Sequence, residues 1–231
     1  MIPLRDTIRS RRFPWITVLL IAINVYVFYV EWTTGPTPAA GIGMLAERYG
    51  VIPASIPPLS LLPQVGPGPY LPLITAMFLH GSPVHLLGNM LFLWVFGDNV
   101  EDRLGKGRFL LFYLLTGVLG NWAHVAANPS STIPTIGASG AVAGVLGAYF
   151  LAFPRSRIIT LIFLFVFITV AEVPAWVFLL VWFGLQVFNG LAALGAPNVS
   201  LVAWWAHVAG FVAGAAGLLL LAPRRRAPRW L

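Results

Sequence analysis

The chain has 231 residues, of which 58% are hydrophobic and only 9% are charged, and its mean hydropathy is +0.85. A water-soluble protein of this length needs more charged residues to cover its surface. The composition therefore excludes a soluble globular protein and predicts an all-α protein embedded in a membrane. The absence of cysteine excludes disulfides, thiol catalysis and cysteine-ligated metal.

The first apolar run of membrane-spanning length covers residues 15–32 and follows the basic stretch 9–12. This opening resembles a secretory signal peptide, but further spans follow, so we expect a signal-anchor helix that is retained. Residues 33–72 contain nine prolines and yet remain apolar. Because prolines at that density prevent a long helix, we predict a loop that lies partly in the membrane interface.

Five further spans are predicted along the rest of the chain. The second span has a clear start, because Ser82 offers an N-cap hydroxyl and Pro83 suits the first helical position. The five predicted ranges are 83–102, 108–126, 139–153, 176–194 and 200–221. We therefore predict a single membrane domain over residues 1–231, built as a bundle of six transmembrane helices.

The segment 158–171 is almost wholly apolar and could form a seventh span. With six spans, 13 of the 14 basic residues lie on one side and only Arg48 lies on the other, as the positive-inside rule predicts for the cytoplasmic side. A seventh span would place the C-terminal arginines at 224–229 outside. We therefore expect 158–171 to be a hairpin or interfacial stretch on the cytoplasmic side, and both termini to be cytoplasmic. The net charge of +7 then reflects topology and needs no nucleic-acid partner.

Four polar residues are predicted to share one depth in the membrane. In the six-span topology the helices at 83–102, 139–153 and 200–221 all run from outside to inside. At a rise of 1.5 Å per residue, four side chains then lie within about 10 Å of the outer surface: His85, Asn89, Ser139 and His207. A serine and a histidine at matching depth indicate a nucleophile and its base inside a bilayer.

Each of these residues also has a structural explanation. Ser139 could be a packing residue, since glycines at 140, 144 and 147 form a small face that matches glycines at 210, 214 and 217. Packing of these two faces would itself bring His207 next to Ser139. His207 could also be a hydrogen-bonding strut. His80 lies in the loop before the second span, where a structural role is more common, and we assign no role to His124.

Metal binding is the rival explanation for several histidines. The chain has no His-x3-His pair, and the sequence places no carboxylate near the histidines of the outer half. We therefore expect neither a metal nor another cofactor.

Three motifs resemble the rhomboid family of intramembrane serine proteases over about residues 73–220. They are Gly137-Ala138-Ser139-Gly140, the stretch Ala206-His207-Val208-Ala209-Gly210-Phe211-Val212-Ala213-Gly214, and the His-x4-His-x3-Asn pattern of His80, His85 and Asn89. The resemblance implies that Ser139 is the nucleophile and His207 the general base of a two-residue dyad. It also implies that His85, Asn89 and the backbone N–H of Ser139 stabilise the oxyanion, with Gly137 and Gly140 as supporting glycines.

The resemblance also implies partners and a location. The substrates would be transmembrane segments of other proteins, cleaved near the outer face of the bilayer. The compact six-span form with short tails and no transit peptide indicates a prokaryotic plasma membrane.

Two positions depart from the family pattern. Leu71-Pro72 stands where many rhomboids have Trp-Arg, which affects the placement of the first loop. Ala143 stands where many have an aromatic residue that stacks on the catalytic histidine. The neighbour that orients His207 is therefore left open.

Two other classes of protein remain as alternatives. A non-catalytic rhomboid-like protein that binds membrane helices would typically lack the serine or the histidine, and this chain has both. A small transporter or channel would carry polar groups through the full depth of the membrane. Against that, the lower halves of the predicted helices 83–102, 139–153 and 200–221 are expected to be almost purely apolar.

Overall fold

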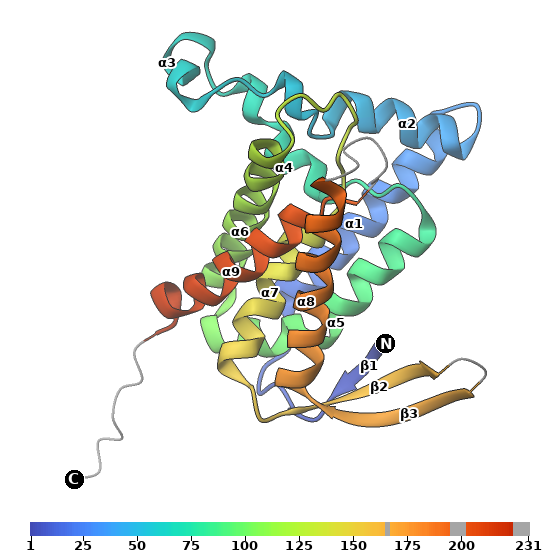
Figure 1. Ribbon diagram of the computed structural model, residues 1–231, viewed down its shortest axis with the longest axis vertical. Helices are drawn as coiled ribbons and strands as arrows, with labels where there is room; N and C mark the ends of the chain where they lie inside the picture. The colour runs from blue at the N-terminus through green and yellow to red at the C-terminus, as the bar shows by residue number, and fades with distance from the viewer. Residues whose placement is uncertain (165–166, 195–201, 224–231) are drawn as a thin grey trace.

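The chain forms a bundle of helices with a small β-sheet at one end, as Figure 1 shows. The computed structural model describes residues 1–164, 167–194 and 202–223. The end that carries strands β1–β3 is called the sheet end. The opposite end, which carries residues 35–82, is called the loop end.

Four helices in the described part of the chain are long and apolar enough to cross a membrane. They are α1 (Trp15–Thr34), α6 (Lys106–Ala127), α8 (Ala175–Leu194) and α9 (Trp204–Leu221). A fifth candidate is α5 (Pro83–Leu104) together with the short helical stretch Gly68–Phe78, from which it is bent by 84°. These helices match the predicted ranges to within a few residues. The start predicted for the last span, at residue 200, lies outside the described residues.

The range predicted as the fourth span forms a shorter helix, α7 (Ser139–Ala152), of 14 residues. At 1.5 Å per residue it is about 21 Å long, whereas a bilayer core is about 30 Å thick. The structure therefore supports a mostly helical membrane protein with four or five candidate spans.

The prediction of a loop over 33–72 is wrong for part of that range. Residues Pro38–Tyr49 form helix α2, because Pro38 stands at the first helical position and no proline follows until Pro53. The Thr37 side chain caps the helix by accepting from the Ala40 N–H at 3.3 Å. The rest of the range is broken into short pieces, as the prolines predict: η1 (Pro53–Ser55), η2 (Leu59–Leu61), α3 (Leu62–Val65) and η3 (Gly68–Tyr70), followed by α4 (Pro72–Thr75) and η4 (Ala76–Phe78).

An antiparallel sheet of order β1-β2-β3 closes the sheet end, so the expectation of an all-α fold is wrong there. Its strands are β1 (Ile2–Asp6), β2 (Arg157–Leu164) and β3 (Phe167–Pro174). The hairpin expected over 158–171 is confirmed, and it is slightly longer than predicted. Residues 157–174 are rich in isoleucine, valine and threonine, which suit a strand better than a helix.

Helix α7 lies in the centre of the bundle, with every residue from Gly140 to Tyr149 buried. Its backbone touches the backbone of α9. A Cβ added at Gly147 would collide with the Phe211 carbonyl, and one added at Gly214 would collide with the Gly144 carbonyl. The predicted packing of the two glycine faces is therefore confirmed for Gly147, Gly210 and Gly214, where it requires the absence of side chains. It is not confirmed for Gly144 and Gly217, because a Cβ at these positions would meet Thr116 and Phe112 of α6.

Polar side chains near the sheet end of α5 hold the N-terminal segment. The Glu101 carboxylate accepts the backbone N–H of Ile16 at 3.1 Å and of Thr17 at 2.8 Å, and so caps the start of α1. Asn99 donates to the Asp6 carboxylate at 2.8 Å. The expectation of an almost purely apolar lower half is therefore wrong for α5, because buried backbone groups of the N-terminal segment need these partners.

The glycine contact predicts a large stability difference between two alanine substitutions. In Gly214→Ala the new methyl group meets backbone atoms of Gly144, so we expect a loss of about 1–3 kcal/mol in the free energy of unfolding. Gly184→Ala on α8 is the control, because a Cβ there meets nothing within 4 Å. Thermal unfolding in detergent measures both, and equal midpoints for the two variants would contradict the packing argument.

A pH-dependent stability is predicted for the sheet end. Burial raises the pKa of the Asp6 carboxyl from 3.8 to about 6. Between these two values the folded protein keeps a proton that the unfolded chain releases, so stability falls as the pH rises through this window. Asp6→Asn lacks this titration. We expect the melting temperature of the wild type to fall relative to that of Asp6→Asn between about pH 4 and pH 6. A difference that is constant over this range would disprove the assignment.

Candidate active site

Ser139 is the first residue of α7, and the chain reaches it through a turn that requires glycine at position 137. Gly137 has φ = +131°, a conformation that side chains rarely adopt, and its N–H donates to the Ala76 carbonyl at 2.9 Å. A Cβ at Gly137 would lie 2.8 Å from Nε2 of the His85 ring. Glycine at this position therefore lets the His85 ring approach the backbone just before Ser139.

His207 lies in the first turn of α9 and faces Ser139. Its Nε2 is 2.7 Å from the Ser139 Oγ, a hydrogen-bonding distance. The side chain of His207 is 9% exposed. The turn of α9 that carries it packs closely on α6, since a Cβ at Gly120 would lie 2.8 Å from the Ala206 carbonyl. The structure thus brings together the two residues predicted as nucleophile and base.

The other ring nitrogen of His207 meets a residue that the sequence analysis missed. His207 Nδ1 is 2.8 Å from Oε1 of Gln186 on α8. Gln186 is 7% exposed and is the first amide side chain in an otherwise apolar stretch of α8. The sequence did contain a signal for Gln186, namely an amide side chain inside an apolar membrane helix. Such a group needs a polar partner.

His85 and Asn89 lie on the first two turns of α5, in which Ser82 caps the helix as predicted. The Ser82 hydroxyl accepts the His85 backbone N–H at 3.1 Å. The His85 Nδ1 accepts the Gly81 N–H at 3.4 Å, so its Nε2 carries the proton of the neutral ring. Asn89 is 8% exposed, and its Nδ2 finds no hydrogen-bond partner within the part of the chain that the structure describes.

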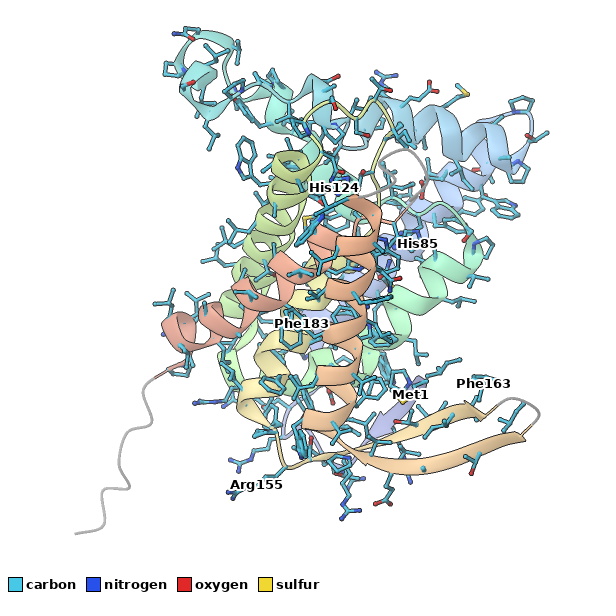
Figure 2. All side chains as sticks on the ribbon, in the orientation of Figure 1. Met1, His85, His124, Arg155, Phe163 and Phe183 are labelled. Carbon is cyan, nitrogen blue, oxygen red and sulfur yellow. The ribbon has the colours of Figure 1, made fainter. Side chains whose placement is uncertain are left out.

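These side chains surround one cavity of about 340 Å³ between α5, α7, α8 and α9. Its polar lining residues are His85, Asn89, Thr135, Ser139, Gln186 and His207, and its apolar ones include Phe92 and Trp182. His85 lies nearer to the loop end than to the sheet end, as Figure 2 shows. The four residues predicted at one depth therefore share one cavity.

The remaining two histidines lie beside this cavity and do not line it. The buried His80 donates its backbone N–H to both oxygens of Glu31 on α1, at 3.1 and 3.0 Å. The expectation that no carboxylate lies near these histidines is therefore wrong. The reason is that Glu31, at the loop end of α1, satisfies a buried backbone donor. His124 Nε2 is 3.0 Å from the Thr135 hydroxyl, within the segment that leads to Ser139.

No group of three or more histidine, cysteine or acidic side chains suited to a metal ion occurs among the residues that the structure places. The cavity itself offers hydroxyl, imidazole and amide groups. That set suits acyl transfer, which needs a nucleophile, a base and hydrogen-bond donors for an oxyanion.

Comparison with known proteins finds relatives that are named as rhomboid proteins. The chain is 35% identical to rhomboid protease GluP of Bacillus subtilis (strain 168), over 58% of this chain and 24% of that protein. It is 38% identical to putative rhomboid protease YdcA of the same organism, over 41% of this chain and 48% of that protein. It is 35% identical to rhomboid protein 1, mitochondrial, of Saccharomyces cerevisiae, over 39% of this chain and 28% of that protein. The chain thus spans between about a quarter and a half of the length of these relatives.

A family model described as the rhomboid domain matches residues 67–224, which is more than half of the chain. The match contains α5 to α9 and all residues of the cavity described above. The chain therefore belongs to the rhomboid family.

Proposed function

We propose that this protein is an intramembrane serine endopeptidase that cleaves transmembrane segments of other proteins by a Ser139–His207 dyad. The observation that carries the proposal is the 2.7 Å distance between Ser139 Oγ and His207 Nε2, at the wall of a cavity that also holds the unpaired Asn89 Nδ2. Membership of the rhomboid family, whose relatives here include named proteases, supports the same activity.

The chemistry divides into two acyl transfers. His207 Nε2 takes the Ser139 proton while Oγ attacks the peptide carbonyl, and the imidazolium then gives that proton to the leaving amine. The acyl group remains on Ser139. A water molecule, deprotonated by the same imidazole, next attacks the ester. The imidazolium then gives that proton to Ser139 Oγ as the ester C–O bond breaks, and the new carboxylic acid is released.

Charge on the carbonyl oxygen develops in both steps and needs donors. The N–H of Ser139 belongs to the first turn of α7, where backbone donors lack partners inside the helix and the helix dipole is positive. The His85 Nε2–H and the unpaired Asn89 Nδ2 lie on the same cavity. We assign these three donors to the oxyanion. Gly137 supports the site by letting the His85 ring approach the chain, whereas a Cβ at Gly140 would meet the Ala206 carbonyl at an ordinary contact distance of 3.6 Å.

The proposed topology has six spans in one domain, with α7 as the short central one. Because α7 is enclosed by other helices, its length does not have to match the bilayer. Figure 2 places Met1 and Arg155 at the sheet end. Further basic residues there are Arg5 in β1, Arg157 in β2 and Arg103 in the last turn of α5. This distribution supports a cytoplasmic sheet end, with the cavity in the outer half of the membrane. The C-terminal arginines lie outside the described residues.

We extend the proposal to the substrate and to the location of the protein. A transmembrane helix keeps its carbonyls in hydrogen bonds, so a substrate must unwind locally before Ser139 can reach a peptide bond. Segments with glycine or proline near their outer end require less free energy to unwind. We propose a prokaryotic plasma membrane as the location. The yeast relative is a mitochondrial protein, so a purified protein in liposomes is the cleanest test system.

The dyad predicts the effect of two substitutions on cleavage of a reporter with one membrane span in liposomes. Ser139→Ala and His207→Ala should each lower kcat by at least about 10⁴-fold, because nucleophile and base act as a unit. Ser60→Ala, at an exposed serine of η2, is the matched control and should cleave like the wild type. Cleavage that survives Ser139→Ala would refute the mechanism. A folded wild type that cleaves none of several reporters would favour a non-catalytic rhomboid-like protein that binds membrane helices.

The oxyanion assignment predicts that activity and stability respond differently at Asn89. Asn89→Leu should lower kcat by about 100- to 1000-fold, as expected for loss of one oxyanion donor. Because Asn89 Nδ2 makes no hydrogen bond to the described parts of the chain, its removal should not lower the melting temperature. Parallel measurement of kcat and thermal unfolding checks this, and a loss of stability without a loss of kcat would exclude the role.

A further inference from the structure

We propose that Gln186 is a positioning residue that holds His207 in the tautomer required of a general base. This inference rests on the proposed function, and it concerns the orientation of the imidazole that Ala143 leaves open. The hydrogen bond between Gln186 on α8 and His207 on α9 is its starting point.

The orientation of the Gln186 amide is determined by a second contact. Gln186 Nε2 donates to the main-chain carbonyl of Trp182 at 3.0 Å. With the NH₂ group on that acceptor, the atom that faces His207 is Oε1, at 2.8 Å from Nδ1. The opposite orientation would place two carbonyl oxygens against each other.

The tautomer of His207 follows from this arrangement. A carboxamide oxygen can only accept, so the proton of the neutral imidazole must reside on Nδ1. The lone pair is then on Nε2, which lies 2.7 Å from the Ser139 Oγ and can take its proton. In the other tautomer Nε2 would carry a hydrogen and could not act as a base.

Aromatic side chains complete the support of the ring. The Trp182 and Trp204 rings lie with their centroids 6.1 Å from that of His207, at interplanar angles of 34° and 86°. Ala143 on α7 has a side chain of one methyl group and cannot stack on an imidazole. The α8 helix therefore supplies both a hydrogen bond and a packing surface to the proposed base.

A purely structural explanation makes a different prediction. Gln186 could simply satisfy the polar atoms of a buried histidine, in which case its replacement would lower stability and leave the nucleophile's reactivity unchanged. A positioning role instead affects kcat and the reactivity of Ser139, because both depend on a free lone pair at Nε2. These readouts separate the two roles.

The test uses two variants of Gln186 in the full chain. Gln186→Met has a similar length and no acceptor for Nδ1, whereas Gln186→Glu keeps an acceptor and adds a charge. Asn189→Leu is the control on the same helix, because the Asn189 amide donates to the Leu185 carbonyl of its own helix at 2.7 Å. Four quantities are measured: kcat and KM for the single-span reporter, the rate at which a fluorophosphonate labels Ser139, the melting temperature, and the ¹⁵N shifts of the histidine rings.

For Gln186→Met we expect kcat to fall by about 10- to 100-fold, less than the roughly 10⁴-fold effect of replacing the buried carboxylate of a triad protease. KM should stay within about twofold, since uniform substrate binding is unchanged, and labelling of Ser139 should slow in parallel with kcat. The ¹⁵N spectrum should show His207 protonated on Nδ1 in the wild type and a tautomer mixture in the variant. Asn189→Leu should behave like the wild type in all of these measurements.

Gln186→Glu should restore kcat toward the wild-type value. A carboxylate beside Nδ1 also stabilises the imidazolium, so the acidic limb of the kcat/KM profile should move to higher pH. The other titratable groups near His207 are His85 on α5 and His124 on α6, and they are identical in every variant. Rescue by glutamate together with this shift is not expected of a residue that only fills space.

The outcomes separate this inference from the proposed function. A wild type that neither cleaves the reporter nor is labelled at Ser139 would overturn the proposed function. An active wild type with an equally active Gln186→Met variant would overturn the positioning role alone. The positioning role is also overturned if Gln186→Met loses activity only in proportion to its folded fraction, or if His207 in the wild type is protonated on Nε2.

Discussion

The backbone contact between α7 and α9 is the constraint on which the rest of the molecule depends. Glycines at 147, 210 and 214 leave no Cβ between the two helices, so carbonyl groups of one helix lie against the glycines of the other. Ser139 begins one of these helices and His207 lies in the first turn of the other. Two touching backbones therefore determine the positions from which the Ser139 and His207 side chains reach each other.

Two buried carboxylates hold α1 against its neighbours, as the glycine contacts hold α7 against α9. Glu101 of α5 accepts backbone N–H groups at the start of α1, and Glu31 near the end of α1 accepts the His80 N–H just before α5. Each carboxylate thus accepts hydrogen bonds from main-chain N–H groups, where the usual partner of a buried carboxylate would be a cation. The pair ties α1 to α5 at both ends of the bundle. The turn that presents His85 is held in this way by Glu31, a residue that does not itself line the cavity.

The sequence predicted the helices whose apolar runs are long, and the cap at Ser82, because both signals are local. It did not predict β1, since a five-residue strand becomes recognisable only when β2 lies beside it. Helix α2 was missed because the density of prolines was averaged over a range that contains a proline-free stretch. The pairing of Ser139 with His207 was accessible through motif resemblance. The contact between Gln186 and His207 was not, because the two residues lie 21 positions apart on different helices and only tertiary packing brings them together.

Because glycines of α9 make its contact with α7, the opposite surface of α9 takes no part in that contact. Leu219 and Leu220 are 74% and 84% exposed, and on α8 Phe188 is 69% exposed. None of these side chains lies at the α7–α9 contact or at the cavity. Bilayer thickness and lipid composition act on the exposed side chains, whereas the backbones that carry Ser139 and His207 touch on the opposite side of the helix. Such a separation lets the surface of the protein adapt to different membranes while the geometry of its centre stays constant.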